Sequence, residues 1–286
     1  MRLIRLSFAG KELCDSSQDG RRLSETIPRL FISRKTDCVS RQAPVGNVVL
    51  GKNRLTCRIG AYAPGGTIGE DDMQPKVHLK ANDTILFTGD SITAAERHQK
   101  AYRPLGFGYV HFAGNFLLAG YPKLNLHIMN TGVSGDTVID LRHRWERDCL
   151  AHQPDVLSVL IGINDVWQLT MEPDLAQTAA TPDEYELTYD QLLAQARQQC
   201  GCQLVLMEPF MFCRDPHDRV FRALTPYIEI VRRLAAKHKA TAVFLQRELD
   251  ALLAEVPPER WSEDAVHPCL WAHAWIAQRW LQATRL

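Results

Sequence analysis

The chain has 286 residues, of which 45% are hydrophobic, and this is enough for a sizeable core in one large domain or two small ones. Its 33 lysine and arginine residues equal its 33 aspartate and glutamate residues, so no net field attracts nucleic acid or an anionic membrane. In residues 1–10, charges interrupt an apolar run that is too brief for an export signal or a bilayer span. We therefore expect a cytoplasmic protein that binds neither nucleic acid nor membrane.

The eight cysteines of the chain are scattered through it. In a chain of this length without an export signal they predict reduced thiols rather than a disulfide framework. The closest pair, Cys200 and Cys202, has one intervening residue, whereas paired zinc ligands are usually separated by about two to four. No metal or other cofactor is expected.

Residues 1–72 differ in composition from the rest of the chain. They hold 12 basic and 8 acidic residues and 8 of the 17 glycines, but none of the six tryptophans. Two short runs, Val48–Gly51 and Leu55–Ile59, could form a weak hairpin. We expect a poorly ordered extension, which translation starting upstream of a true start at Met73 would explain; the alternative is a docking or regulatory arm.

From Ala81 onward, short apolar runs alternate with longer amphipathic ones. Strands are expected at residues 84–88, 125–130, 155–161, 203–207 and 241–245, and helices at 109–119, 137–152, from 181, at 220–238 and at 268–284. Pro226 interrupts one helical pattern, so that helix is expected either to kink there or to begin near Thr225. The alternation predicts one α/β domain with three α/β/α layers and a five-stranded parallel sheet.

Ser91 follows the first predicted strand, after a break at Gly89 and Asp90. This puts the serine at the carboxyl end of the strand, the edge where open α/β sheets bind ligands. The side chain could be a nucleophile, or it could cap a helix, because Gly-Asp-Ser is also ordinary turn chemistry.

Two further loops carry groups that could stabilise a developing negative charge. Gly135 can present its backbone N–H to a cleft without an obstructing side chain, although the loop could simply be a strand-to-helix turn with Asp136 near the amino end of the helix. Asn164 offers a neutral amide donor for an oxyanion hole, although Asn164 and Asp165 could instead stabilise a turn.

The pair Asp264 and His267 precedes the last predicted helix. A separation of three residues across one turn can bring the carboxylate to one imidazole nitrogen while the other nitrogen faces the serine. Histidine would then be the general base. In the alternative interpretation, Asp264 caps the helix and His267 is a surface residue.

Together the four segments point to acyl transfer through Ser91, and their order resembles the SGNH (GDSL-type) hydrolase family. The resemblance runs from about residue 81 to residue 286, and Ile92 departs from it where the family has leucine. It implies a hydrolase domain over residues 73–286 with a Ser91, Asp264 and His267 triad. The oxyanion hole would comprise the N–H groups of Ser91 and Gly135 and the Asn164 amide.

Further segments resemble the bacterial acetylxylan esterases; they cover residues 104–110, 134–138, 144–148, 163–167 and 183–186. This resemblance implies an acetyl ester on a xylo-oligosaccharide, with Asp90 and Trp167 as candidate pocket residues, although Trp167 could instead belong to the core. Without an export signal, an imported oligosaccharide fits better than intact xylan. The alternatives are a lipid-type esterase or thioesterase for longer acyl chains, and a non-hydrolytic sugar-binding protein. The oligomeric state is open, and a homo-oligomer is compatible with the outer helices.

Overall fold

The computed structural model describes residues 74–172, 174–175 and 177–286. The expectations of a poorly ordered extension over residues 1–72 and of a hairpin within it lie outside the described residues. Within those ranges, no helix has both the length and the apolar character needed to cross a bilayer.

Five parallel strands form the sheet, in the spatial order β2-β1-β3-β4-β5. Their bounds are β1 (Thr84–Gly89), β2 (His127–Asn130), β3 (Val156–Leu160), β4 (Gln203–Met207) and β5 (Thr241–Val243). The second strand lies on one side of β1 and the third on the other, and Gly89 pairs with Leu160 in the register. The strand order therefore reverses beside β1, and this is where an open α/β sheet leaves a crevice at its carboxyl edge.

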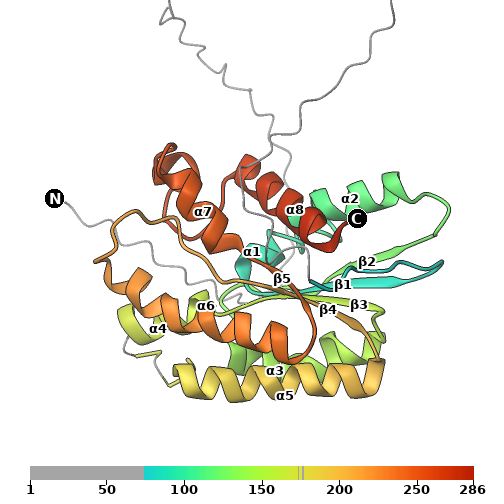
Figure 1. Ribbon diagram of the computed structural model, residues 1–286, viewed down its shortest axis with the longest axis horizontal. Helices are drawn as coiled ribbons and strands as arrows, with labels where there is room; N and C mark the ends of the chain where they lie inside the picture. Colours follow the sequence, from blue (N-terminus) through green and yellow to red (C-terminus); the bar gives the residue numbers. More distant parts are fainter. Residues whose placement is uncertain (1–73, 173, 176) are drawn as a thin grey trace, which may run out of the picture. The chain divides into compact units, whose positions relative to one another are not determined.

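Helices cover both faces of the sheet, which confirms the predicted three-layer α/β/α architecture (Figure 1). One layer contains α1 (Ser91–Ala94), α2 (Tyr109–Gly120), α7 (Leu245–Leu253) and α8 (Leu270–Thr284). The other contains α3 (Val138–Asp148), α4 (Ile163–Met171), α5 (Pro182–Cys200) and α6 (Arg219–Lys237). Short 3-10 turns span Leu150–His152 and Pro258–Arg260.

The segment that carries Asn164 is a helix rather than the expected loop. Helix α4 begins at Ile163, directly after Gly162, whose φ of +127° turns the chain sharply out of β3. Helix α7 is also absent from the elements that the sequence predicts, because the apolar pattern places Leu245 in the preceding strand. That strand ends at Val243, since the apolar run that suggested a longer strand is shared between β5 and the start of α7.

Helix α6 continues through Pro226, so the expectation of a start near Thr225 is wrong. Its true start lies at Arg219, where the Asp218 carboxylate accepts the N–H groups of Val220 and Phe221, both at 2.9 Å. A proline inside a helix removes one backbone hydrogen bond. Four side chains around it are buried in the core and oppose that loss, namely Leu224, Tyr227, Ile228 and Val231.

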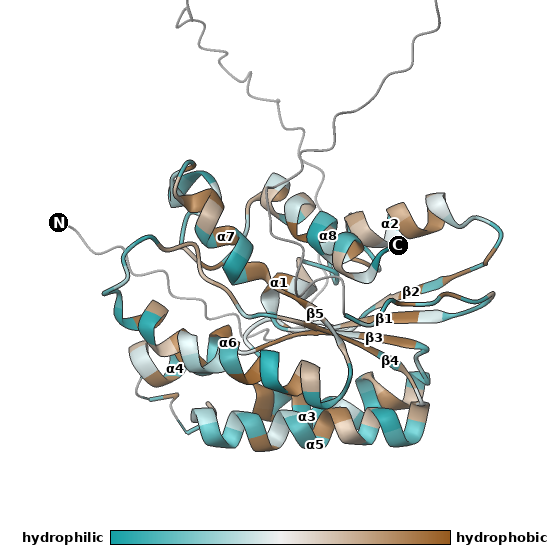
Figure 2. Ribbon diagram, viewed as in Figure 1, coloured by the Kyte–Doolittle hydropathy of each residue, from teal (hydrophilic) through white to brown (hydrophobic). Residues whose placement is uncertain are grey.

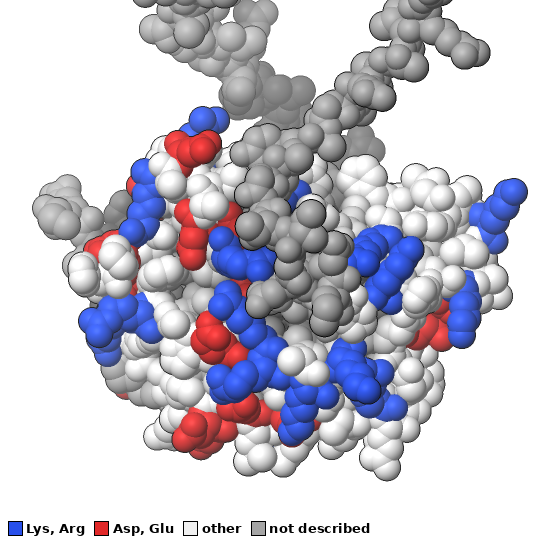
Figure 3. Space-filling model, in the orientation of Figure 1, with Lys and Arg blue, Asp and Glu red and all other residues white. Residues whose placement is uncertain are grey.

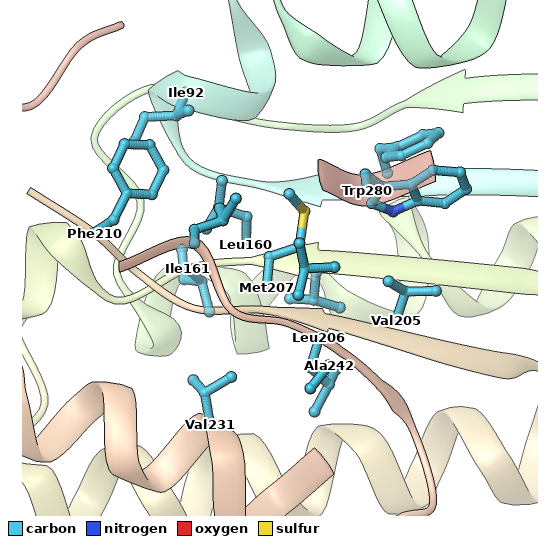
Figure 4. Close-up of a cluster of buried hydrophobic side chains, with 14 of the residues drawn as sticks. Ile92, Leu160, Ile161, Val205, Leu206, Met207, Phe210, Val231, Ala242 and Trp280 are labelled. Atoms are coloured by element: carbon cyan, nitrogen blue, oxygen red, sulfur yellow. The ribbon is translucent and has the colours of Figure 1, made fainter. Parts of the chain in front are cut away.

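The core lies on both sides of the sheet, and apolar side chains from the strands meet those from the helices (Figure 4). The strands are mostly apolar, whereas the outer helices carry polar residues on their exposed sides (Figure 2). Trp280 illustrates the packing, because its ring lies 5.1 Å from that of Phe87 and its indole N–H donates to Ser158 Oγ at 2.9 Å. Burying one such large side chain stabilises a fold by about 1.5–3 kcal/mol.

Charged side chains of both signs are interspersed on the face shown in Figure 3, in keeping with the balanced composition. The five cysteines in the described ranges are free thiols, namely Cys149, Cys200, Cys202, Cys213 and Cys269.

Candidate active site

Ser91 stands directly after the turn that ends β1. Gly89 has a φ of +150°, and a Cβ atom on it would lie 1.9 Å from the Leu160 carbonyl oxygen, so only glycine fits between the two strands. Asp90 then caps α1, because its Oδ1 accepts the Ile92 N–H at 3.0 Å. The sharp turn places Ser91 as the first residue of α1, at the carboxyl edge of the sheet.

The serine hydroxyl meets the imidazole of a distant histidine. Ser91 Oγ lies 2.8 Å from His267 Nε2, and His267 Nδ1 lies 2.6 Å from Asp264 Oδ2. A carboxylate can only accept, so Nδ1 carries the imidazole proton and Nε2 is left to accept the serine proton. The arrangement can therefore act as a nucleophile with a general base.

Several donors hold Asp264 in place. Its Oδ1 accepts the Ser262 hydroxyl at 3.0 Å and the N–H groups of Val266 and His267 at 3.0 and 2.8 Å. Burial raises the pKa of Asp264, but the hydrogen bonds from His267 and Val266 outweigh burial and bring the pKa down to about 2. The carboxylate is therefore ionised at neutral pH, as it must be to orient the imidazole.

The two predicted oxyanion donors come from adjacent segments. Gly135 has a φ of +88°, and its N–H donates to no acceptor within the described ranges. Asn164 lies in the first turn of α4, and its amide nitrogen donates to the Asp136 carbonyl at 3.0 Å. Because an amide nitrogen carries two hydrogens, Asn164 can still donate to a second acceptor.

Asp165 secures the segment that carries Asn164. Its carboxylate accepts the N–H groups of Val138 and Ala180, both at 3.1 Å, and joins the start of α3 to the chain before α5. Burial raises the pKa of Asp165 to about 8. The sequence suggested that Asp165 stabilises its own turn. Instead, its carboxylate connects two other segments of the chain.

Arg144 is a residue of this region that sequence reasoning missed as a site residue. The side chain is only 7% exposed, and its Nε donates to Asp136 Oδ2 at 2.5 Å. Its Nη1 and Nη2 donate to the carbonyls of Thr131 and Gly89 at 2.7 and 2.9 Å. The available signal was helical spacing, since Arg144 follows Leu141 by three residues and so lies at the edge of the buried stripe of α3.

The two candidate pocket residues occupy different environments. Asp90 is 1% exposed, and its Oδ2 has no hydrogen-bond partner in the described part of the chain. Burial raises the pKa of Asp90 to about 7. Trp167 is half-buried against the edge of the core, and its indole N–H donates to Glu172 Oε1 at 3.2 Å. Asp90 is thus enclosed behind the nucleophile, whereas part of Trp167 reaches the surface.

Over the described ranges, no group of three or more histidine, cysteine, aspartate or glutamate side chains is arranged to hold a metal ion.

Similarity to known proteins covers most of the described chain. The sequence profile of the GDSL-like Lipase/Acylhydrolase family matches residues 87–274. An acetylxylan esterase of Geobacillus stearothermophilus is 33% identical over 208 residues, which span 71% of this chain and 94% of that protein. Its crystal structure superposes with a TM-score of 0.69 at 32% identity, covering 73% of this chain and 97% of that chain.

Other solved structures agree with these relationships. An α/β hydrolase enzyme from the metagenome of Lake Arreo, Spain, gives a TM-score of 0.68 at 32% identity, over 72% of this chain and 97% of that chain. Three variants of the Geobacillus enzyme are described as catalytic mutants, with a serine, a histidine or an aspartate replaced by alanine. In that enzyme the aspartate precedes the histidine by three residues.

Proposed function

Since the chain belongs to the GDSL-like lipase/acylhydrolase family and is a carboxylic ester hydrolase of the SGNH serine esterase type, we propose that it removes acetyl groups from xylo-oligosaccharides through an acyl-enzyme on Ser91. The observation that carries the proposal is the chain of hydrogen bonds from Ser91 through His267 to Asp264. The same hydrogen-bonded arrangement of serine, histidine and aspartate performs acyl transfer on unrelated folds.

In the acylation step, His267 Nε2 takes the Ser91 proton while Ser91 Oγ bonds to the ester carbonyl carbon. The carbonyl oxygen becomes an oxyanion, and the N–H groups of Ser91 and Gly135 and the Asn164 amide donate to it. The tetrahedral intermediate collapses, the bond to the sugar oxygen breaks, and His267 returns the proton to that oxygen. The products are the free sugar hydroxyl and acetyl-Ser91.

In the deacylation step, water replaces the sugar. His267 removes a proton from the water as it attacks the acetyl carbonyl, and the same donors hold the second oxyanion. Collapse releases acetic acid and returns the proton to Ser91 Oγ. The ionised Asp264 keeps the imidazole in the required tautomer and stabilises the imidazolium in both steps.

The acetyl-xylo-oligosaccharide substrate is supported by the Geobacillus relative, whose described activity is on acetylxylan. Half-buried Trp167 offers an aromatic surface on the same helix as Asn164, and such a surface suits a sugar ring or a small acyl group. Asn164 and Trp167 are three residues apart in the first turns of α4 and so lie on the same side of the helix. A substrate that reaches the Asn164 amide would therefore also come close to the Trp167 indole.

The test compares acetyl and octanoyl esters of p-nitrophenol with acetylated xylo-oligosaccharides, using the full chain. We expect the acetyl ester to be preferred, acetate to be released from the oligosaccharides, and Ser91→Ala to lose both activities. A preference for octanoyl would instead support the lipid-type esterase. Full hydrolysis by Ser91→Ala would refute the serine mechanism.

A further inference from the structure

The guanidinium of Arg144 joins two segments that border the proposed site. One of its acceptors is the carbonyl of Gly89, two residues before Ser91, at 2.9 Å. Two more lie in the segment after β2, where the Thr131 carbonyl accepts at 2.7 Å and the Asp136 carboxylate at 2.5 Å. Longer contacts of 3.4 Å reach Thr88 Oγ1 at the end of β1 and the Asp148 carboxylate on the helix of Arg144 itself. A single buried side chain therefore connects the end of β1 to the turn that carries Gly135.

A third segment is attached to the same group through Asp136. The carboxylate of Asp136 binds Arg144, and its backbone carbonyl accepts the Asn164 amide at 3.0 Å. Hydrogen bonds thus run from Gly89 through Arg144 and Asp136 to Asn164. The three proposed oxyanion donors belong to the residues at or beside these points, which are Ser91, Gly135 and Asn164.

The planar guanidinium of Arg144 is well suited to holding several chain segments together, beyond neutralising a carboxylate. Its N–H groups lie in one plane with fixed directions, so three acceptors that bind it are held at fixed angles to one another. A buried charge is costly unless it is fully paired, and a buried ion pair is weak evidence for stability on its own. Two of the strong acceptors of Arg144 are backbone carbonyls, which a purely charge-neutralising role would not need.

Arg232 provides a matched comparison within the same fold. It also binds a buried carboxylate that directly follows a strand, because its Nε lies 2.6 Å from Glu208 Oε1 after β4. Its second partner is the Glu229 carboxylate at 2.7 Å. In the described ranges, neither partner is adjacent in sequence to a proposed catalytic group. Arg232, whose side chain is 34% exposed against 7% for Arg144, therefore shows what weakening a partly buried ion pair away from the site does to the enzyme.

We propose that Arg144 is a positioning residue of the esterase: through Gly89, Thr131 and Asp136 it holds the N–H groups of Ser91 and Gly135 and the Asn164 amide at the spacing that one oxyanion requires. This inference rests on the proposed function of those donors. Arg144 itself touches no reacting atom, and it acts by keeping three separate segments in register.

The first experiment measures kcat and KM of Arg144→Lys with an acetyl ester. Lysine keeps the charge but cannot donate in three fixed directions. We expect kcat to fall by about 10- to 100-fold, since small misplacements at a site have effects of that size, while KM changes by less than about threefold. Arg232→Lys should keep kcat within about twofold of the wild type while its unfolding temperature falls, because the ion pair with buried Glu208 is weakened far from the proposed catalytic groups.

The second experiment separates positioning from general damage. If Arg144 acts through the oxyanion donors, Arg144→Lys should lower kcat much less in an Asn164→Ala background than in the wild type, because part of what it positions is already gone. An undiminished loss in that background would contradict the proposal. So would a rise in KM at constant kcat, or a wild-type kcat in Arg144→Lys.

A milder variant covers the case in which Arg144→Lys fails to fold. Asp136→Asn retains the backbone carbonyl that binds Asn164 but weakens the bond to Arg144, so kcat should fall by about 3- to 20-fold in a folded protein. An unchanged kcat in folded Asp136→Asn would then overturn the positioning role. If Ser91→Ala stays active, the proposed function itself fails; if Ser91→Ala is inactive and both positioning variants are normal, only this inference fails.

Discussion

The carboxylate of Asp165 accepts the backbone N–H of Val138 at 3.1 Å, and this contact joins the first turn of α4 to the first turn of α3. The adjacent Asn164 amide donates to Asp136 across the same junction. The candidate site is therefore supported by buried polar contacts between helix starts, in addition to the sheet beneath it.

Asp165→Asn should change how stability depends on pH. Burial raises the pKa of Asp165 from 3.8 to about 8 in the folded protein. The stability that the protonated group contributes is fully present below the unfolded pKa of 3.8 and is lost as pH rises through about 8. Asparagine cannot ionise, so chemical denaturation at a series of pH values should show a smaller decline for Asp165→Asn between about pH 4 and pH 8. An identical decline in stability in both proteins would contradict the raised pKa of Asp165.

Ser91→Ala should lower kcat for an acetyl ester by about 10⁴- to 10⁶-fold, because the nucleophile is removed while the binding surface and oxyanion donors remain. The variant should unfold at nearly the wild-type temperature, since Ser91 is only partly buried and its side chain hydrogen-bonds to the half-exposed His267. Stopped-flow measurement of a p-nitrophenol burst should show no burst for the variant.

Asn164→Ala should lower kcat by about 10²- to 10³-fold with little change in KM, as expected for a donor that acts on the transition state. Gln168→Ala is a control on the same helix, because its side chain contacts Thr178 and none of the proposed catalytic groups. A variant of Asn164 with raised KM and normal kcat would assign the amide to substrate binding instead.

Asp264→Asn should lower kcat by about 10⁴-fold, because a neutral amide can select the wrong histidine tautomer. The pKa of Asp264 is lowered from 3.8 to about 2 in the fold, so the stability that its charge contributes is present above 3.8 and is lost as pH falls toward 2. The unfolding temperature, measured from pH 5 to pH 2, should therefore fall less steeply for Asp264→Asn than for the wild type. A kcat within tenfold of the wild type would remove Asp264 from the triad.

Gly89→Ala should destabilise the protein by about 2–4 kcal/mol, since the new methyl group would meet the Leu160 carbonyl and the residue has a positive φ. Gly120→Ala is the matched control, because nothing lies within 4 Å of its added Cβ and it is the last residue of α2. Urea denaturation should show no loss of stability for the control, and a small gain of up to about 1 kcal/mol is expected from helix propensity.

Local patterns predicted most of the fold. The strand β3 was recognisable because a buried parallel strand is a short apolar run, here bounded by Asp155 and Gly162. The start of α5 was recognisable from its capping box, and Glu184 does accept the Thr181 N–H at 3.0 Å. Helices α4 and α7 escaped detection because each begins within three residues of the end of a strand, where the two hydrophobic periods overlap.

The chemical identities of the candidate groups were also visible in the sequence. Ser91, Asn164 and His267 could be singled out because serine, amide and imidazole each supply a function that acyl transfer needs. Arg144 could not be assigned a role in this way. Its significance depends on acceptors from two other segments, chiefly Gly89, Thr131 and Asp136, and no local spacing reveals them.

Local patterns in the sequence predict the five strands, the longer helices, their order and the reactive groups that follow the strands, but not helices α4 and α7. They can do so because hydrophobic period, turn residues and side-chain chemistry are local properties. Ser91 and His267 are 176 positions apart, and it is the folded chain that brings Ser91 Oγ to 2.8 Å from His267 Nε2. It alone decided that Arg144 connects the segments of the proposed oxyanion donors. Such distances follow from strand register and core packing, which join residues far apart in the chain and have to be correct to a fraction of an ångström.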